Sequence, residues 1–149
     1  MKNFILFSLV LFVTTLSFGQ TTQKYNSILD RIEFYDSRGN LTGYAKENSI
    51  LKRTEYYDER GNLVKYEKNN SILKRTETYD ARGNQQGYEK RNNILNRTEN
   101  YDSKGNKTGY RKWNKIMNRY DVYDANNRKI GHYKYNSIMK RWEYTESGF

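Results

Sequence analysis

The stretch that decides the fold is residues 48–69, which reads Asn-Ser-Ile-Leu-Lys-Arg-Thr-Glu-Tyr-Tyr-Asp-Glu-Arg-Gly-Asn-Leu-Val-Lys-Tyr-Glu-Lys-Asn. The chain repeats this unit without a break in spacing. The asparagines that open the units stand 22 residues apart, at Asn26, Asn48, Asn70, Asn92, Asn114 and Asn136. Five units are complete and the sixth is truncated. A fixed period of this length is typical of a repeat architecture.

Each unit is predicted to be a β-hairpin. Its turn is Asp-Glu-Arg-Gly-Asn at 58–62, and related turns stand at 36–40, 80–84 and 102–106. Aspartate favours the start of a type I turn, and Gly61 suits the left-handed position that closes a three-residue loop. In the fifth unit Asn127 replaces this glycine, and asparagine is the next best residue for positive φ. The flanking residues are rich in Thr, Tyr and Ile, as strands require.

The proposed turn sets a strand register in which Tyr57 lies opposite Leu63, Tyr56 opposite Val64 and Thr54 opposite Tyr66. Neither face of such a sheet is clearly apolar, which argues against a compact β-sandwich. We therefore expect an all-β fold, an elongated, twisted antiparallel meander of tandem 22-residue hairpins. A slip of one residue in one strand would exchange the faces of that strand.

The N-terminus has the pattern of a secretory signal. Lys2 precedes an apolar run from Phe4 to Val13, and the small residues Ser17 and Gly19 fit a cleavage site. The prediction is a signal peptide over 1–19, one repeat domain over 20–149 that starts at Gln20, and export to the periplasm or the outside of the cell. No transmembrane segment is expected after cleavage, and the absence of cysteine excludes disulfides.

The turn and its flanks resemble a known repeat. Tyr-Asp-x-x-Gly-Asn-Leu at 35–41 and 57–63, and the same core without leucine at 79–84 and 101–106, resemble the YD repeats of the RHS family. That resemblance implies β-sheet built from hairpins and a loose association with carbohydrate binding. The chain is far shorter than an RHS shell, and its single-file hairpins are more similar in arrangement to MORN repeats. We therefore expect this chain to share the hairpin architecture of such repeats and not their activities.

The sequence contains few candidates for the residues that enzymes use in catalysis. Cysteine is absent, which excludes a Cys nucleophile and a Cys/His zinc site, and the single histidine, His132, takes the place that tyrosine holds in other units. The carboxylates recur in every unit beside arginine, whereas a catalytic group needs one special environment. Turn aspartates could bind Ca²⁺, but turn formation already explains them. We therefore expect no enzyme, cofactor or metal.

The charge is strongly basic. Lys and Arg number 27 against 17 Asp and Glu, and removal of the signal peptide takes Lys2 away, which leaves 26 − 17 = +9. This charge is compatible with a solvated face that keeps a sheet soluble. It also fits attraction to a polyanion such as lipopolysaccharide or another anionic glycan. Nucleic acid is the weaker option for an exported protein.

The repeat departs from its pattern at the C-terminal end, where aromatic residues accumulate. These residues are either an end cap, because terminal units are usually atypical, or an aromatic platform for a ligand. In the proposed register Tyr120 faces His132, Trp142 shares their face, and Trp113 and Tyr135 fall on the opposite one. The candidate ligand-binding residues are Tyr120, His132, Trp142, Lys134, Lys140, Trp113, Tyr133 and Tyr135.

The leading hypothesis is a non-catalytic exported module that binds an anionic glycan or an envelope surface. The alternative is a structural or assembly protein that pairs through exposed sheet edges with copies of itself or with another sheet.

Overall fold

The chain folds into twelve antiparallel strands that close into one barrel, seen in a computed structural model that describes residues 22–147. The predicted signal peptide and its cleavage site lie outside the described residues. The strands are β1 (Thr22–Asn26), β2 (Arg31–Tyr35), β3 (Leu41–Asn48), β4 (Arg53–Asp58), β5 (Leu63–Asn70), β6 (Arg75–Asp80), β7 (Gln85–Asn92), β8 (Arg97–Asp102), β9 (Lys107–Asn114), β10 (Arg119–Asp124), β11 (Lys129–Asn136) and β12 (Arg141–Glu146). Within residues 22–147 no helix is long and apolar enough to cross a membrane.

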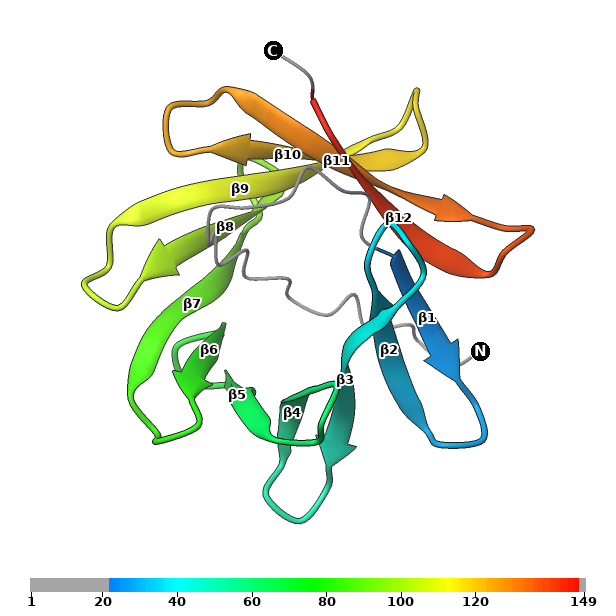
Figure 1. The fold of residues 1–149 in the computed structure, drawn as a ribbon. Coiled ribbons are helices and arrows are strands. Elements are labelled where there is room, and N and C mark those ends of the chain that lie inside the picture. Colours follow the sequence, from blue (N-terminus) through cyan, green and yellow to red (C-terminus); the bar gives the residue numbers. More distant parts are fainter. Residues whose placement is uncertain (1–21, 148–149) are drawn as a thin grey trace.

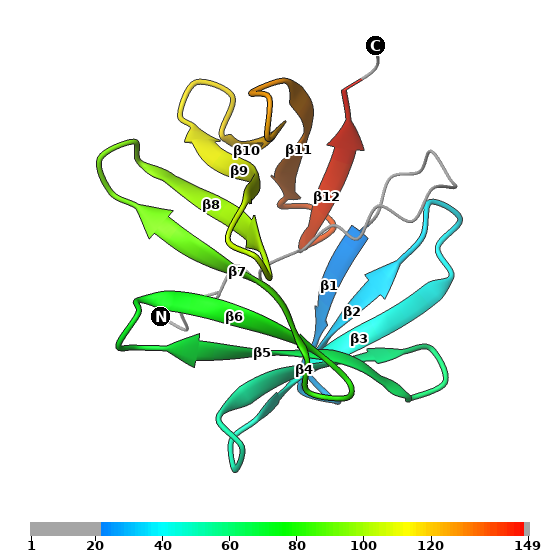
Figure 2. The ribbon, with the colours of Figure 1, turned by 90° about the vertical axis from the view of Figure 1, so that its left-hand side faces the viewer.

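Each strand pairs with its neighbours in sequence, and β1 pairs with β12 to complete the ring (Figures 1 and 2). The all-β class and the hairpin repeat are confirmed. The predicted elongated, open meander is wrong, because the twelve strands form a closed barrel. Closure satisfies the backbone groups that an open sheet would leave unpaired at its two edges.

One extra residue in each hairpin explains the missed register. Tyr57 does lie opposite Leu63, but the ladder then shifts by one residue, so that Tyr56 pairs with Lys65 and Thr54 with Glu67. Val64 is the extra residue of this β-bulge, and corresponding bulges interrupt the other hairpins of this kind. A bulge bends its strand and increases its twist. Because a bulge recurs in each hairpin of this kind, the bulges together curve the sheet. The register predicted from the sequence contained no bulge.

The predicted glycine turns are confirmed. Gly61 has φ +85° and its N–H donates to the Asp58 carbonyl at 3.1 Å. The Asp58 carboxylate accepts from the Asn62 N–H at 2.7 Å, and Asn127 takes the positive φ of the missing glycine. These turns lie at one end of the barrel, here called the Gly rim.

The opposite end, here called the Ile rim, consists of six four-residue loops that each carry an isoleucine. The loops are 27–30, 49–52, 71–74, 93–96, 115–118 and 137–140. In the second of them, the Asn48 side chain accepts a hydrogen bond from the Leu51 N–H at 3.0 Å, and Lys52 adopts a left-handed φ of +50°. The loop conformation is therefore set by its asparagine and its last residue.

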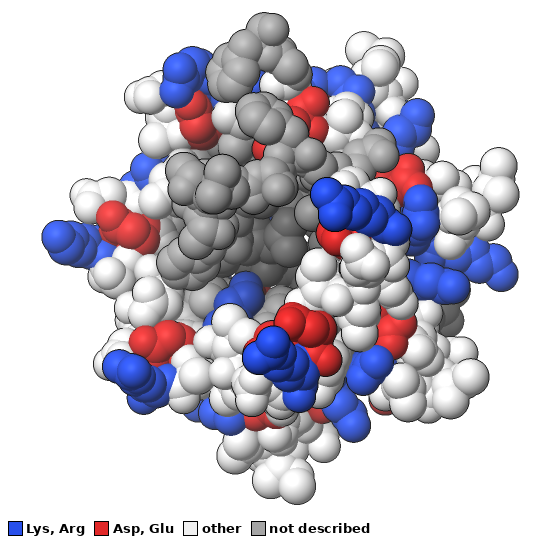
Figure 3. All heavy atoms as spheres, in the orientation of Figure 1, with Lys and Arg blue, Asp and Glu red and all other residues white. Residues whose placement is uncertain are grey.

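The outer face of the barrel holds the constant residues of the repeat. Glu55 accepts from Arg53 Nε at 2.8 Å, from the Tyr57 hydroxyl at 2.7 Å and from Asn48 Nδ2 at 3.1 Å. The Arg53 guanidinium lies 4.2 Å from the centre of the Tyr66 ring in the same sheet. Equivalent clusters recur around the barrel, and Figure 3 shows basic and acidic side chains side by side on its surface.

These clusters explain the repeated carboxylates without catalysis. Burial alone would raise the pKa of Glu55, but the hydrogen bonds from Tyr57, Arg53 and Asn48 hold that pKa below its usual value. In turn, the bond to Glu55 raises the pKa of the Tyr57 hydroxyl to about 12. The charged carboxylate and the neutral phenol thus stabilise each other across the neutral pH range.

Candidate functional site

The inner face of the barrel holds the residues that change from unit to unit. One such position reads Ala45, Glu67, Glu89, Arg111 and Tyr133 along the chain, whereas the outer positions keep Arg, an acid and Tyr. The register places these residues on the face opposite to the Arg53 and Glu55 ladder. A ligand that enters the barrel would therefore meet side chains whose size and charge differ from one part of the ring to another.

Near the Ile rim the inner face is divided into a polar half and an aromatic half, which together we call the mouth. The polar half comprises the cross-strand pairs Glu47–Thr54, Asn69–Thr76 and Arg91–Thr98. The aromatic half comprises the pairs Trp113–Tyr120 and Tyr135–Trp142, and the sixth pair, Tyr25–Ile32, lies between the two halves. The mouth thus combines hydrogen-bonding groups with ring faces.

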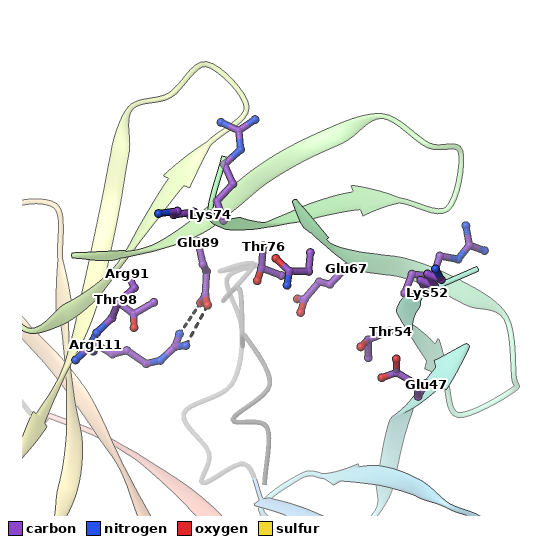
Figure 4. A pocket seen from close by; sticks show the side chains of 13 residues that line it. Glu47, Lys52, Thr54, Glu67, Lys74, Thr76, Glu89, Arg91, Thr98 and Arg111 are labelled. Atoms are coloured by element: carbon purple, nitrogen blue, oxygen red, sulfur yellow. Dashed lines mark hydrogen bonds and ion pairs between the residues drawn. The ribbon is translucent and has the colours of Figure 1, made fainter. Parts of the chain in front are cut away.

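The polar half borders a cavity of about 440 Å³ that extends to the Ile rim, where Lys52 and Lys74 line it. Figure 4 shows Glu47, Thr54 and Thr76 directed into this space. A volume of this size falls within the range of small-molecule sites.

Deeper in the cavity, two ion pairs are held away from solvent. Arg111 Nη2 lies 3.0 Å from Glu89 Oε2, and Lys65 Nζ lies 3.1 Å from Glu67 Oε1 (Figure 4 marks the first pair). Burial raises the pKa of Glu67, although Lys65 and Tyr56 both donate to it. Burial alone would lower the pKa of Arg111, but its pairing with Glu89 raises that pKa instead. These two ion pairs form the floor of the cavity, and within each pair the opposite charges compensate each other.

The aromatic half forms one connected cluster. The ring centres of Trp113 and Tyr120 are 4.7 Å apart, those of Tyr120 and Trp142 are 6.0 Å apart, and those of Tyr135 and Trp142 are 5.4 Å apart. The ring planes cross at 47–61°, edge to face for Trp113 and Tyr120 and tilted for the other two pairs, so the rings do not form a flat stack. Tyr135 remains 40 % exposed at the rim.

The structure brings five of the eight predicted site residues onto the inner face: Trp113, Tyr120, Tyr133, Tyr135 and Trp142. The predicted separation of Trp113 and Tyr135 from Tyr120 and Trp142 is wrong, because one bulge in the β8–β9 hairpin and another in the β10–β11 hairpin shift the register. Tyr133 lies deeper than the mouth, with its ring centre 4.7 Å from that of Tyr144. Burial raises the pKa of the Tyr133 hydroxyl.

The other three predicted residues lie outside the mouth. His132 pairs with Asp121 on the outer face and not with Tyr120 as predicted. Burial lowers its pKa, and the nearby Arg119 and Lys129 charges act in the same direction. Lys134 is exposed on the outer face, and Lys140 ends the last Ile-rim loop.

Sequence reasoning missed the polar side of the site, above all Glu67, Glu89 and Arg111. The signal was present, because these residues occupy one repeat position whose side chain changes in charge and size between units.

No metal site is found in the described part of the chain. Within residues 22–147, no three His, Cys, Asp or Glu side chains are grouped to hold an ion.

Comparisons with known proteins inform the fold alone. No protein-family model matches the sequence, and no curated protein matches it. A crystal structure of a protein from Arabidopsis thaliana is similar, with a TM-score of 0.63 and 11 % sequence identity. The alignment covers 87 % of this chain and 80 % of the plant protein. The chain is therefore similar in fold to that protein, at an identity too low to transfer a function.

Proposed function

We propose that the protein is a non-catalytic binding module that takes a carbohydrate at the mouth of the barrel. The observation that carries this proposal is the division of the mouth into two halves. The C–H face of a sugar ring packs against indole and phenol rings such as Trp142 and Tyr120. Its hydroxyl groups need donors and acceptors, which Thr76, Asn69 and Glu47 supply.

The charges of the mouth favour recognition through hydroxyl groups. Glu47 and Arg91 contribute opposite charges at the rim, and the acids of the floor are paired with Arg111 and Lys65. Lys134 and Lys140, the basic residues expected to hold an anionic glycan, stand outside the mouth. An acidic substituent would therefore be recognised only where the glycan passes over the rim.

The alternative of assembly through sheet edges has less structural support. Its premise was a row of unpaired backbone groups, whereas β1 pairs with both β12 and β2. Among the described strands each has a neighbour on both sides. Self-association would have to use side chains or loops instead. Export remains a prediction from the N-terminal sequence.

The test is an array of neutral and acidic oligosaccharides, followed by titration of any bound sugar with intrinsic tryptophan fluorescence. Trp142→Ala should weaken binding at least tenfold, while Trp113 keeps the fluorescence signal. Tyr123→Phe is the matched control, because Tyr123 stacks on Tyr110 on the outer face. An array without a bound sugar, or equal binding by Trp142→Ala and wild type, would refute the proposed site.

A further inference from the structure

The Ile rim exposes a ring of apolar side chains that the fold itself does not use. The first apolar residue of each loop is isoleucine in all six units, with 90–95 % of its surface exposed. The residue after it is leucine or methionine and is about half exposed, between 47 and 51 %. We call these twelve side chains the crown. Its members are Ile28, Leu29, Ile50, Leu51, Ile72, Leu73, Ile94, Leu95, Ile116, Met117, Ile138 and Met139.

The crown is not needed to form the loops. Asn48 and the left-handed Lys52 hold the loop backbone, so that a polar residue at Ile50 would serve the turn equally well. Within the same loops the position before the isoleucine is less constant, since Asn93 and Lys115 stand where the other four loops have serine. Twelve exposed apolar side chains at one end of the barrel, two on each loop, indicate an interaction site more than the same residues scattered over the surface would.

A basic collar surrounds the crown on the outer face. Two residues before each opening asparagine stands an exposed lysine, and no ion pair holds any of the six among the residues described. These lysines are Lys24, Lys46, Lys68, Lys90, Lys112 and Lys134. The loops add four further lysines and a single acid, Asp30, which accepts a hydrogen bond from Tyr25. The five turns of the Gly rim, in contrast, set five arginines or lysines against six acids.

We infer that the Ile rim docks onto an anionic phospholipid bilayer. Side chains from six separate loops around an opening would each need a pocket on a protein partner, whereas fluid hydrocarbon accommodates them in any arrangement. The collar would lie at the level of the lipid phosphates, as basic residues do beside inserted apolar groups. Tyr25 and Tyr135, each 40 % exposed at the mouth, suit the interfacial layer where tyrosine is enriched. A second copy is a poorer occupant, because two basic collars would face each other.

Docking does not depend on the proposed carbohydrate site. Where both hold, the mouth faces the headgroup layer, and a sugar carried by a lipid headgroup becomes its natural ligand. That consequence alone rests on the proposed function.

The experiment is co-sedimentation of the purified protein with vesicles of phosphatidylcholine, with and without a quarter of phosphatidylglycerol. We expect binding to the anionic vesicles that weakens with salt, because exposed charges are screened. The crown variant Ile50→Ser/Ile72→Ser/Ile94→Ser should bind at least tenfold more weakly, since each isoleucine loses its transfer into hydrocarbon. Val64→Ser, which changes an aliphatic residue that is 54 % exposed near the Gly rim, is its control.

The collar is tested by Lys46→Gln/Lys68→Gln/Lys90→Gln. This variant should lose about a hundredfold in affinity, because each lysine near an anionic surface contributes roughly fivefold. Arg38→Gln/Arg60→Gln/Arg82→Gln removes the same charge from the Gly rim and should bind as wild type. Trp142→Ala should keep vesicle binding even where it loses a sugar, which separates the two proposals.

Three results would overturn the inference. The first is wild-type protein that does not bind anionic vesicles. The second is a crown variant that binds them as well as wild type does, with its circular dichroism unchanged. The third is wild-type protein that self-associates in sedimentation velocity and binds no vesicle, with a monomeric crown variant. That third result would assign the crown to contacts between copies of the protein.

Discussion

Replacing Glu55 by glutamine should destabilise the barrel through the outer ladder. In the native protein one carboxylate oxygen accepts from Arg53 and Asn48, and the other accepts from the Tyr57 hydroxyl. Glutamine keeps the shape and one acceptor oxygen, but it removes the charge that faces the Arg53 guanidinium. The Glu55 side chain is only 9 % exposed and that of Arg53 is 22 % exposed, so water replaces the lost partner poorly.

The expected cost follows from these contacts. A charge-assisted hydrogen bond contributes about 1.5–3 kcal/mol, and the partial exposure of Arg53 lowers the expected loss to about 1–2 kcal/mol. For a domain of this size such a loss corresponds to a decrease in melting temperature of roughly 4–8 °C. Glu59→Gln is the matched control, because Glu59 lies in the exposed turn of the same unit with its side chain 54 % exposed.

The pH dependence makes the test specific. The pKa of Glu55 is lowered in the folded state, so its contribution is complete above the unfolded pKa and is lost as the pH falls through the folded pKa. The difference between wild type and Glu55→Gln, measured by thermal circular dichroism, should shrink as the pH is lowered from 7 towards 3. A difference that is absent at pH 7, or that stays constant to pH 3, would refute the electrostatic role of the ladder.

Three other measurements test the fold and the site. Gly61→Val should destabilise the protein by about 1–3 kcal/mol and Glu59→Ala by much less, since valine adopts positive φ only with strain; equal melting temperatures would contradict the turn. Absorbance titration should place the ionisation midpoint of Tyr57 near pH 12, and Glu55→Gln should lower that midpoint. Because the folded pKa of Tyr57 is raised, the contribution of this hydroxyl to stability is complete below about pH 10 and is lost as the pH rises through 12. Small-angle scattering should give a radius of gyration near 14 Å, as for a compact chain of this length, and a clearly larger value would favour an open array.

Much of the local structure was predictable from the repeat. The hairpins, the turns at Asp58 and Gly61, and the substitution of Asn127 for glycine follow from residues that act within five positions of one another. Closure was not predictable in this way, because it depends on the bulge at Val64 and on the pairing of β1 with β12. A bulge at Val64 has no sequence mark as strong as glycine at positive φ.

The corresponding bulges of the β8–β9 and β10–β11 hairpins decided the outcome for the candidate site. The accumulation of aromatic residues identified Trp113, Tyr120 and Trp142, and the structure gathers them into one cluster. The register error separated Trp113 from its partner Tyr120 and placed His132 beside the wrong residue. The polar half was not recognised while the sheet was expected to be open, because an open sheet has no enclosed cavity for its residues to line.

The position of constant and variable residues has a consequence for how such a protein can change. In most globular proteins the interior is the part that substitution disturbs most, because its packing holds the fold. Here four junctions between units carry the same stacked tyrosine pair on the outer face, namely Tyr44–Tyr57, Tyr66–Tyr79, Tyr88–Tyr101 and Tyr110–Tyr123. One hairpin can therefore replace another. Each replacement changes the inner residues of two strands and keeps the tyrosine pair that stacks on the next unit. Recombination between units of one gene would therefore give barrels with the same outer tyrosine pairs and a different inner lining.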